Sequence, residues 1–244
     1  MARLADFRLL CFDVFGTLID WESGVVAGLQ PLLAANSSTT PIPRERLLAA
    51  YAECEAAQQA ATPDMPYSQL LATIHPRVAA RLGLAQPPTP EQDAAFGATV
   101  GTWPAFPDSV DALRRLARHY RLTVLSNVDR ASFARTLSGP LAGVPFDAVF
   151  TAQDAGSYKP DPRNFEYMLR EVRERFAVEP QQVLQTAQSQ FHDHHPARRI
   201  GLRSCWIVRP GAVMGNQDEE VYDWKFDTLK DMADALDAEL AEGK

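Results

Sequence analysis

The sequence predicts an α/β fold in which a parallel sheet is covered by helices and carries an inserted helical subdomain. Residues 9–13 form an apolar run of strand length that ends in one carboxylate, and a run apolar on both faces is typical of a buried parallel strand. From Pro107 onward, strand-like and helix-like segments alternate, which favours a three-layer parallel sheet with right-handed crossovers. We therefore expect a Rossmann-like core from residues 1–20 and 104–244, with a helical cap at 21–103.

The cap segment contains several helix patterns and no strand signal between them. The predicted helices are 23–35, 44–61, 67–82 and a short one that ends near residue 100. They are separated by loops rich in Pro, Ser and Thr at 36–43, 62–66 and 86–90, residue types that interrupt helices. Pro76, which follows His75, is expected to kink or divide the third helix. Helices in a row without a strand indicate a subdomain inserted after the first strand.

The core segment alternates between the two kinds of element. The predicted strands are 122–125, 146–151, 183–187 and 204–208, and the predicted helices are 108–119, 130–137, 162–176, 195–200 and 227–241. Asp108 is a candidate N-cap for the first of these helices. Pro162 lies in the first turn of another, where proline is favoured. Residues 211–223 carry weak signals and are expected to form a loop.

The composition excludes several classes of partner. The chain has 244 residues, 46% of them hydrophobic, enough for one large domain or for a domain with an insertion. Its formal net charge is −7, without a run of basic residues, which argues against binding to nucleic acid or to an anionic membrane surface. A small-molecule substrate is the expected partner, and exposed cap surfaces could support a homodimer.

The cysteines and the N-terminus bear on the cellular compartment. Cys11, Cys54 and Cys205 are odd in number and at unrelated spacings, which predicts neither a disulfide framework nor a zinc site. The N-terminal apolar run is interrupted by Asp13 and no small-residue cleavage site follows, so no signal peptide is predicted. Since no apolar segment is long enough to span a bilayer, we expect a soluble cytoplasmic protein.

Polar residues gather where the predicted strands end. They are Asp13 after the first strand, Ser126 and Asn127 after the second, Lys159 after the third, and Gln188, Ser189, Gln190 and Asp193 after the fourth. Taken singly, each has an ordinary explanation as a helix cap, a turn residue or a solvated lysine. The carboxyl ends of parallel strands meet at one sheet edge, where open sheets bind ligands, so we expect one site. A carboxylate there, followed by a turn at Gly16 and Thr17, is placed to act as a nucleophile.

Four motifs in this order resemble those of the haloacid dehalogenase-like hydrolases. The first is Asp13-Val14-Phe15-Gly16-Thr17-Leu18, the second is Ser126-Asn127, the third is Lys159-Pro160 and the fourth is the acidic Asp193. The resemblance covers nearly the whole chain, including the place and length of the helical cap. It implies a hydrolase that uses an aspartate nucleophile.

Phe15 separates two branches of that family. Similar phosphatases carry a second aspartate at this position, which serves as general acid and helps to hold Mg²⁺. Phosphoryl transfer depends on neutralising negative charge, usually with a metal ion, whereas phenylalanine gives a drier pocket suited to an organic acid. The resemblance therefore implies the 2-haloacid dehalogenase branch, without a cofactor and without a requirement for Mg²⁺. The alternatives are a phosphatase and a catalytically idle relative that binds a metabolite or a partner.

For this branch, the resemblance implies a displacement in two steps. Asp13 attacks C2 of a small 2-substituted carboxylic acid, and water then hydrolyses the resulting ester to a 2-hydroxy acid of inverted configuration. Lys159 would keep Asp13 ionised, since a neighbouring positive charge favours the charged form, and Thr17 would orient it by a hydrogen bond. Asp193 would hold Lys159 and help to activate the water.

Further residues are expected to bind the substrate. Ser126 Oγ and the Asn127 amide would hold its carboxylate and fix the in-line geometry. Phe15 and Trp21 would form an apolar wall, to which Tyr158 could add. For Trp103 we favour packing at the hinge between cap and core, because aromatic residues are more often part of a core.

Two differences from the dehalogenases leave the identity of the leaving group undecided. Their cap carries an arginine for the halide on a helix that matches residues 44–61, where only Arg44 and Arg46, near its start, are candidates. The positions expected to face the pocket carry Tyr51, Glu53, Cys54 and Glu55. The fourth motif has Gln188 and Gln190 where the dehalogenases have serine and asparagine.

Other runs resemble the L-azetidine-2-carboxylate hydrolase branch of the same superfamily. They are residues 19–22, 103–108, 151–154, 157–160 and 192–194. In that branch a ring amine would leave in place of a halide, and a protonated nitrogen favours a carboxylate over an arginine in the cap. We expect Glu55, or failing that Glu53, to bind the ammonium group; the alternative is that both are ordinary solvated helix residues.

The run His192-Asp193-His194-His195 suggests a metal site, because histidine is a common ligand. Its members are contiguous and lack the i, i+4 spacing that places two ligands on one helical face, and no partner cluster occurs elsewhere. We favour a structural role, with His192 and His194 at the pocket edge or bonded to backbone.

Overall fold

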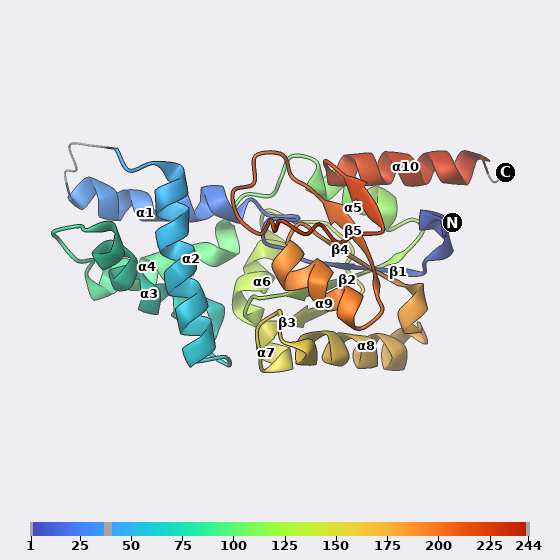
Figure 1. Ribbon diagram of the computed structural model, residues 1–244, viewed down its shortest axis with the longest axis horizontal. Helices are drawn as coiled ribbons and strands as arrows, with labels where there is room; N and C mark the ends of the chain where they lie inside the picture. The colour runs from blue at the N-terminus through green and yellow to red at the C-terminus, as the bar shows by residue number, and fades with distance from the viewer. Residues whose placement is uncertain (1, 37–40, 243–244) are drawn as a thin grey trace.

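A parallel sheet forms the centre of the molecule (Figure 1). The structure is a computed structural model that describes residues 2–36 and 41–242. Within these residues the sheet has six strands in the order β3-β2-β1-β4-β5-β6. They are β1 (Leu9–Phe12), β2 (Arg121–Ser126), β3 (Ala148–Thr151), β4 (Val183–Ala187), β5 (Arg203–Ile207) and β6 (Trp224–Phe226). All neighbouring strands are parallel, so their carboxyl ends lie at one edge of the sheet.

Helices cover both faces of this sheet. The helices of this part are α5 (Ser109–Leu116), α6 (Arg130–Ser138), α7 (Ala152–Ala155), α8 (Pro162–Phe176), α9 (His195–Arg199) and α10 (Leu229–Glu242). Leu10 and Phe12 pack into one core cluster with residues of α5 and α10, whereas Leu9 and Cys11 pack into another with residues of α8 and α9. Alternate residues of β1 serve opposite faces because side chains alternate along a strand. The predicted three-layer α/β architecture is confirmed.

The remaining helices lie together at one end of the sheet (Figure 1). They are α1 (Trp21–Ala35), α2 (Arg44–Ala61), α3 (Tyr67–Leu82) and α4 (Pro90–Ala98). A capping box between Thr89 and Gln92 begins α4, because each side chain satisfies a free backbone N–H of the first turn. Gly83 ends α3 with a φ of 74°, a conformation that favours glycine. A 3₁₀ turn, Thr99–Thr102, returns the chain towards the sheet.

The start of α3 is fastened to the core by two hydrogen bonds. Asp129, the N-cap of α6, accepts from Ser132 N at 2.9 Å and also from Ser68 N at 3.0 Å. Tyr158 Oη donates to Met65 O. Tyr67, the first residue of α3, lies between the two anchored residues Met65 and Ser68, so its position relative to the sheet is fixed.

The structure corrects several predicted elements. Pro76 lies inside α3 and does not divide it, because Ile74 and Val78 on either side are fully buried and this packing outweighs the lost hydrogen bond. The first cap helix begins at Trp21, earlier than predicted. Several short elements were not predicted, among them α7, β6 and a π-helical turn at Gln190–His194.

Asp108 precedes α5, as predicted, but its side chain makes no capping hydrogen bond. Its Oδ1 accepts from Arg209 Nη1 at 2.6 Å and its Oδ2 from Lys230 N at 3.1 Å. The ion pair with a buried guanidinium replaces the local cap.

Residues 37–40 of the loop predicted at 36–43 lie outside the described residues. None of the helices within 2–36 and 41–242 has the length and apolarity that a membrane crossing requires.

Candidate active site

Asp13 lies one residue beyond β1, at the carboxyl edge of the sheet. Its residue is 5% exposed, and its Oδ1 accepts from Lys159 Nζ at 2.9 Å while its Oδ2 accepts from Thr17 Oγ1 at 2.7 Å. The chain turns directly after it at Gly16, whose φ of 89° is accessible to glycine at little cost. Each carboxylate oxygen therefore has a donor, and the carboxylate is held in one orientation.

Lys159 joins two carboxylates in the interior. Its Nζ donates to Asp13 Oδ1 at 2.9 Å, to Asp193 Oδ1 at 2.7 Å and to Leu125 O at 2.9 Å. These bonds use all three donors of an ammonium group. Burial alone would lower the pKa of Lys159, but the charges of the two carboxylates outweigh it and raise that pKa above its ordinary value. Lys159 is therefore a cation at neutral pH.

Asp193 lies on the π-helical turn that follows β4. Its Oδ1 accepts from Lys159 Nζ and also from Gln185 Nε2 at 2.9 Å. Its Oδ2 is buried without a hydrogen-bond partner among the described residues. Burial raises the pKa of the Asp193 carboxyl, with Lys159 opposing and Asp13 reinforcing the shift. The three charged groups thus form one buried cluster, Asp13–Lys159–Asp193.

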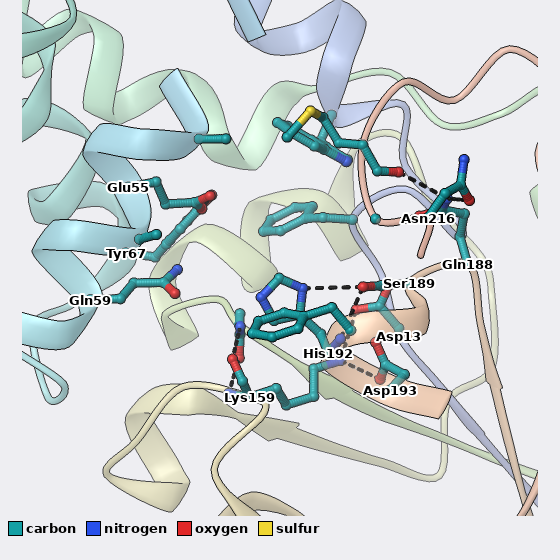
Figure 2. Close-up of a pocket in the computed structure, with 18 residues that line it drawn as sticks. Asp13, Glu55, Gln59, Tyr67, Lys159, Gln188, Ser189, His192, Asp193 and Asn216 are labelled. Atoms are coloured by element: carbon teal, nitrogen blue, oxygen red, sulfur yellow. Dashed lines mark hydrogen bonds and ion pairs between the residues drawn. The ribbon is translucent and has the colours of Figure 1, made fainter. Parts of the chain in front are cut away.

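A cavity of about 280 Å³ opens above this cluster, between the sheet edge and the cap helices (Figure 2). It is lined by Asp13, Phe15, Trp21, Ala52, Glu55, Ala56, Gln59, Tyr67, Asn127, Lys159, Gln188, Ser189, Phe191, His192, Asp193, Met214, Gly215 and Asn216. Lys159 is the one lysine or arginine among the described lining residues, against three carboxyl groups. The cavity therefore carries an excess of acidic groups.

Gln188 links the nucleophile candidate to a loop that closes one side of the cavity. Its backbone N donates to Thr17 Oγ1 at 2.9 Å, and its Nε2 donates to Met214 O at 3.0 Å and to Asn216 Oδ1 at 3.1 Å. A Cβ on Gly215, whose φ is 84°, would lie 2.5 Å from Gln188 Oε1. Glycine at this position therefore permits the close approach of the loop to Gln188.

The same loop is fastened to the cap by Glu22, in the first turn of α1. The carboxylate is buried, and its Oε1 accepts from Val213 N and from Met214 N, each at 2.9 Å. Its Oε2 accepts from Arg44 Nη2 at 3.0 Å. Two cap helices, α1 and α2, are thereby tied to the loop that carries Met214 and Asn216.

Glu55 on α2 faces the cavity from the cap side (Figure 2). Tyr67 Oη donates to Glu55 Oε1, and Tyr51 Oη lies 2.7 Å from Tyr67 Oη. Burial raises the pKa of Glu55 to about 7, against the hydrogen bonds from the two tyrosines, which lower it. A carboxyl group that changes its charge near neutral pH thus stands opposite Asp13.

The other charged candidates of the cap lie outside this cavity. Glu53 is exposed and pairs with Arg81, because residues two apart on a helix point to nearly opposite sides. Arg44 pairs with Glu22, and Arg46 Nη2 donates to Leu82 O at 3.4 Å. Of the two glutamates considered for the ammonium group, the structure places only Glu55 at the cavity.

The residues at the end of β2 are arranged differently from expectation. Asn127 lines the cavity, but its side-chain Nδ2 donates to Lys159 O at 3.0 Å and its Oδ1 accepts from Lys159 N at 2.7 Å. The side-chain amide therefore positions the lysine backbone. Ser126 is 1% exposed and does not line the cavity, and its Oγ has no hydrogen-bond partner among the described residues.

Aromatic residues pack where the cap meets the core. The Phe15 ring stacks on Tyr67 at 5.7 Å between centroids and meets the edge of Trp103 at 5.0 Å. Phe15 and Trp21 line the cavity, whereas Trp103 and Tyr158 do not. Trp103 is almost fully buried, in agreement with packing at the hinge.

The histidines of the 192–195 run point in different directions. His192 lines the cavity, with Nδ1 3.2 Å from Ser189 Oγ (Figure 2). His194 is bound by Ser204 Oγ and Ala187 O, each at 2.9 Å. Burial lowers the pKa of both imidazoles to about 4, so they are neutral at pH 7. Across the described residues, no three His, Cys, Asp or Glu side chains come together as a metal site would require.

Several residues of the site were not predicted. They are Gln185, Glu22, Gln59, Tyr67, Met214 and Asn216. Glu22 was adjacent to a predicted pocket residue, and Gln185 is a polar residue inside a predicted buried strand. That second signal was available in the sequence, because a buried polar side chain requires a partner.

A parallel sheet with a buried Asp–Lys–Asp cluster at its carboxyl edge, beneath helices inserted after the first strand, defines an α/β enzyme with an enclosed site. The model of the haloacid dehalogenase-like hydrolase family matches residues 7–184. The chain belongs to this family.

Individual relatives agree with that assignment. The chain is 34% identical over 117 residues to the human haloacid dehalogenase-like hydrolase domain-containing protein 3, covering 46% of this chain and 43% of that protein. It is 31% identical over 108 residues to an (S)-2-haloacid dehalogenase of Pseudomonas putida, covering 44% and 46%. These alignments thus span less than half of either relative. A crystal structure of an L-2-haloacid dehalogenase is similar with a TM-score of 0.74 and 26% identity, covering 95% of this chain and 99% of the other.

Proposed function

We propose that this enzyme hydrolyses a small 2-substituted carboxylic acid at C2 and that Asp13 forms an ester with the substrate. The observation that carries the proposal is the Asp13 carboxylate, buried at the cavity floor with one oxygen on Lys159 Nζ and the other on Thr17 Oγ1. A carboxylate held in one orientation beside a buried ammonium group is a competent nucleophile. The relatives named as 2-haloacid dehalogenases support the same chemistry.

The proposed reaction has two steps. One Asp13 oxygen bonds to C2 while the bond from C2 to the leaving group breaks, and the electron pair departs with that group. Water then adds to Asp13 Cγ, and Asp193 accepts its proton through Oδ2, which has no other partner among the described residues. The bond from Cγ to the substrate oxygen breaks, and that oxygen takes up the proton to give a 2-hydroxy acid of inverted configuration. The second proton of the water is released to solvent, and Asp13 returns as a carboxylate.

We place the substrate carboxylate at the end of β2. Asn127 lines the cavity there, and the neighbouring Ser126 Oγ is a buried group that no described residue satisfies. Because Ser126 Oγ does not line the cavity in this arrangement, a bound carboxylate would become its partner only once the hydroxyl turns towards the cavity, and an unsatisfied buried hydroxyl is costly. Phe15 and Trp21 would enclose the apolar part of the substrate.

We propose that no divalent metal ion is required. Lys159 Nζ already forms ion pairs with Oδ1 of both Asp13 and Asp193. Phe15 lies at the position where similar phosphatases carry the aspartate that helps to hold Mg²⁺. A magnesium ion takes several oxygen ligands in near-octahedral geometry. The residues present do not fit that requirement, and for the same reason we do not favour a phosphatase.

We propose further that the leaving group is an amine, as in the ring opening of L-azetidine-2-carboxylate. Three carboxyl groups and a single lysine line the described cavity, and Glu55 stands on the cap side opposite Asp13. An ammonium group on the substrate would be stabilised by Glu55, whereas an arginine would repel it. When the bond from C2 to the ring nitrogen breaks, the protonated nitrogen keeps the electron pair and becomes a primary amine.

A substrate panel tests the proposal. The purified enzyme is incubated with L- and D-2-chloropropionate, fluoroacetate, L-azetidine-2-carboxylate and 4-nitrophenyl phosphate, each with and without Mg²⁺, and release of halide, primary amine or phosphate is measured. We expect turnover of one enantiomeric series of 2-substituted acids, fastest for the azetidine, without dependence on Mg²⁺. Turnover of the phosphate ester alone, stimulated by Mg²⁺, would overturn the proposal.

A further inference from the structure

Gln185 is a buried amide in the middle of the sheet and has no part in the steps described above. It lies on β4, is fully buried, and is paired in register with Cys11 of β1. The other residues of β4 are Val183, Leu184, Thr186 and Ala187, and strands buried on both faces are ordinarily apolar. An amide in such a position must bond to something to offset its desolvation.

The partner of Gln185 is Asp193. Gln185 Nε2 donates to Asp193 Oδ1 at 2.9 Å, and Lys159 Nζ donates to the same oxygen at 2.7 Å. Both donors therefore converge on one oxygen of this carboxylate. The other oxygen, Oδ2, is buried and has no partner among the described residues, although Asp193 lines the cavity. Gln185 Oε1 is likewise unpartnered among them.

We propose that Gln185 is a positioning residue that holds Asp193 with Oδ2 directed to the hydrolytic water. With Lys159 alone on Oδ1, the carboxylate could rotate about its Cβ–Cγ bond and bring either oxygen to the ammonium. The second donor, Gln185 Nε2 from β4, fixes the plane of the carboxylate, because two hydrogen bonds from different directions define its orientation. The inference rests on the proposed function, in which Asp193 takes a proton from water that attacks the ester.

Gln185 also stabilises the ionised form of Asp193, since a hydrogen bond donated to a carboxylate favours its charged state. Other titratable groups face this carboxyl from the surrounding elements. They are Lys159 in the loop before α8, Cys11 on β1 and Asp13 directly after β1; on its own turn, Asp193 has His192 and His194 as sequence neighbours. Gln185 is uncharged, so replacing it by an apolar residue removes the bond to Asp193 without adding or removing a charged side chain.

The test compares Gln185→Leu with Thr186→Val. Thr186 is the next residue of β4, is also fully buried, and its Oγ1 has no partner among the described residues, so the control changes a buried polar group that points to the opposite face. Single turnovers with L-2-chloropropionate and with L-azetidine-2-carboxylate are quenched and analysed by intact-protein mass spectrometry. In Gln185→Leu we expect ester formation at the wild-type rate and ester hydrolysis slowed about 10- to 100-fold, so that the adduct accumulates. Thr186→Val should resemble the wild type.

A second readout needs no substrate. The Asp193 carboxyl, assigned by difference from Asp193→Asn, is titrated by carbon-13 NMR in protein labelled at aspartate. Its midpoint should move to higher pH in Gln185→Leu and stay in place in Thr186→Val. Ester hydrolysis at the wild-type rate together with an unmoved titration would overturn the inference. If no variant forms an adduct, the proposed function fails, while the titration still decides whether Gln185 governs Asp193.

Discussion

At the scale of single residues, the three carboxyl groups of the cavity are chemically similar but differ in their surroundings. Asp13 has a donor on each oxygen, Asp193 has two donors on one oxygen, and Glu55 has only tyrosine hydroxyls. Burial without a cation raises the pKa of Glu55 to about 7. Carboxyl groups with different hydrogen-bond partners can take separate roles in one reaction.

The pH dependence of amine turnover follows from Glu55. Below a pH of about 7, the group is protonated and lacks the charge that would bind an ammonium. We expect kcat/KM for L-azetidine-2-carboxylate to rise as the pH passes upward through about 7, because kcat/KM reports groups of the free enzyme. Glu55→Gln should remove this rise and lower kcat/KM about 10- to 100-fold, with little effect on L-2-chloropropionate.

The matched control for Glu55 is Glu53→Gln. Glu53 lies on the same helix but is exposed and paired with Arg81 outside the cavity, so both substrates and both pH profiles should stay as in the wild type. An equal loss for the amine and the halide substrate in Glu55→Gln would contradict a role in binding the ammonium group.

At the scale of elements, the cavity is closed by segments that are distant in sequence. The loop with Met214 and Asn216 is bound on one side by Gln188, after β4, and on the other by Glu22, in α1. The start of α3 is bound to the core through Asp129 and Tyr158. Cap and core are therefore joined by polar contacts on both sides of the cavity.

Removal of the Glu22 contact should loosen this loop. Glu22→Ala leaves the Val213 and Met214 amides and the Arg44 guanidinium without their acceptor, and an unsatisfied buried donor costs about 1–3 kcal/mol. We expect a loss of unfolding free energy of that order, faster hydrogen exchange of the Val213 and Met214 amides, and a raised KM. Denaturant unfolding and exchange mass spectrometry measure these effects.

The control for this variant is Glu45→Ala. Glu45 is an exposed residue of α2 near Arg44 and makes no contact with the loop among the described hydrogen bonds. Exchange of the Val213 and Met214 amides should not change in this control. Unchanged exchange in Glu22→Ala would mean that the carboxylate does not hold the loop.

At the scale of the whole molecule, the sequence pattern predicted the architecture more completely than it predicted the individual side-chain contacts. Helices 44–61, 67–82 and 162–176 and strand 183–187 have the predicted bounds, because long periodic runs and proline starts are strong local signals. Strand β6 was missed, since it has three residues at a partly exposed sheet edge. The π-helical turn at 190–194 was missed because no local pattern distinguishes it from a loop.

For the site, too, the sequence predicted which residues lie together but not all of their contacts. Asp13, Lys159 and Asp193 were predicted to lie together because each follows a strand of a parallel sheet, and the hydrogen bonds show that they do. The contacts of Gln185 and Glu22 depend on side chains that meet only in the folded protein, 8 and more than 190 positions apart in sequence. The choice between Glu53 and Glu55 depends on how α2 is rotated towards the cavity, which composition alone does not fix.

The formation of an ester on Asp13 is tested most directly by following oxygen through a single turnover. Enzyme in excess over L-2-chloropropionate or L-azetidine-2-carboxylate is allowed to react once in water enriched in oxygen-18, and product and protein are separated for mass spectrometry. If Asp13 forms the ester, the first product keeps an unlabelled hydroxyl oxygen and the label appears in the peptide that contains Asp13. A first product that carries the label, with an unlabelled Asp13 peptide, would contradict the account.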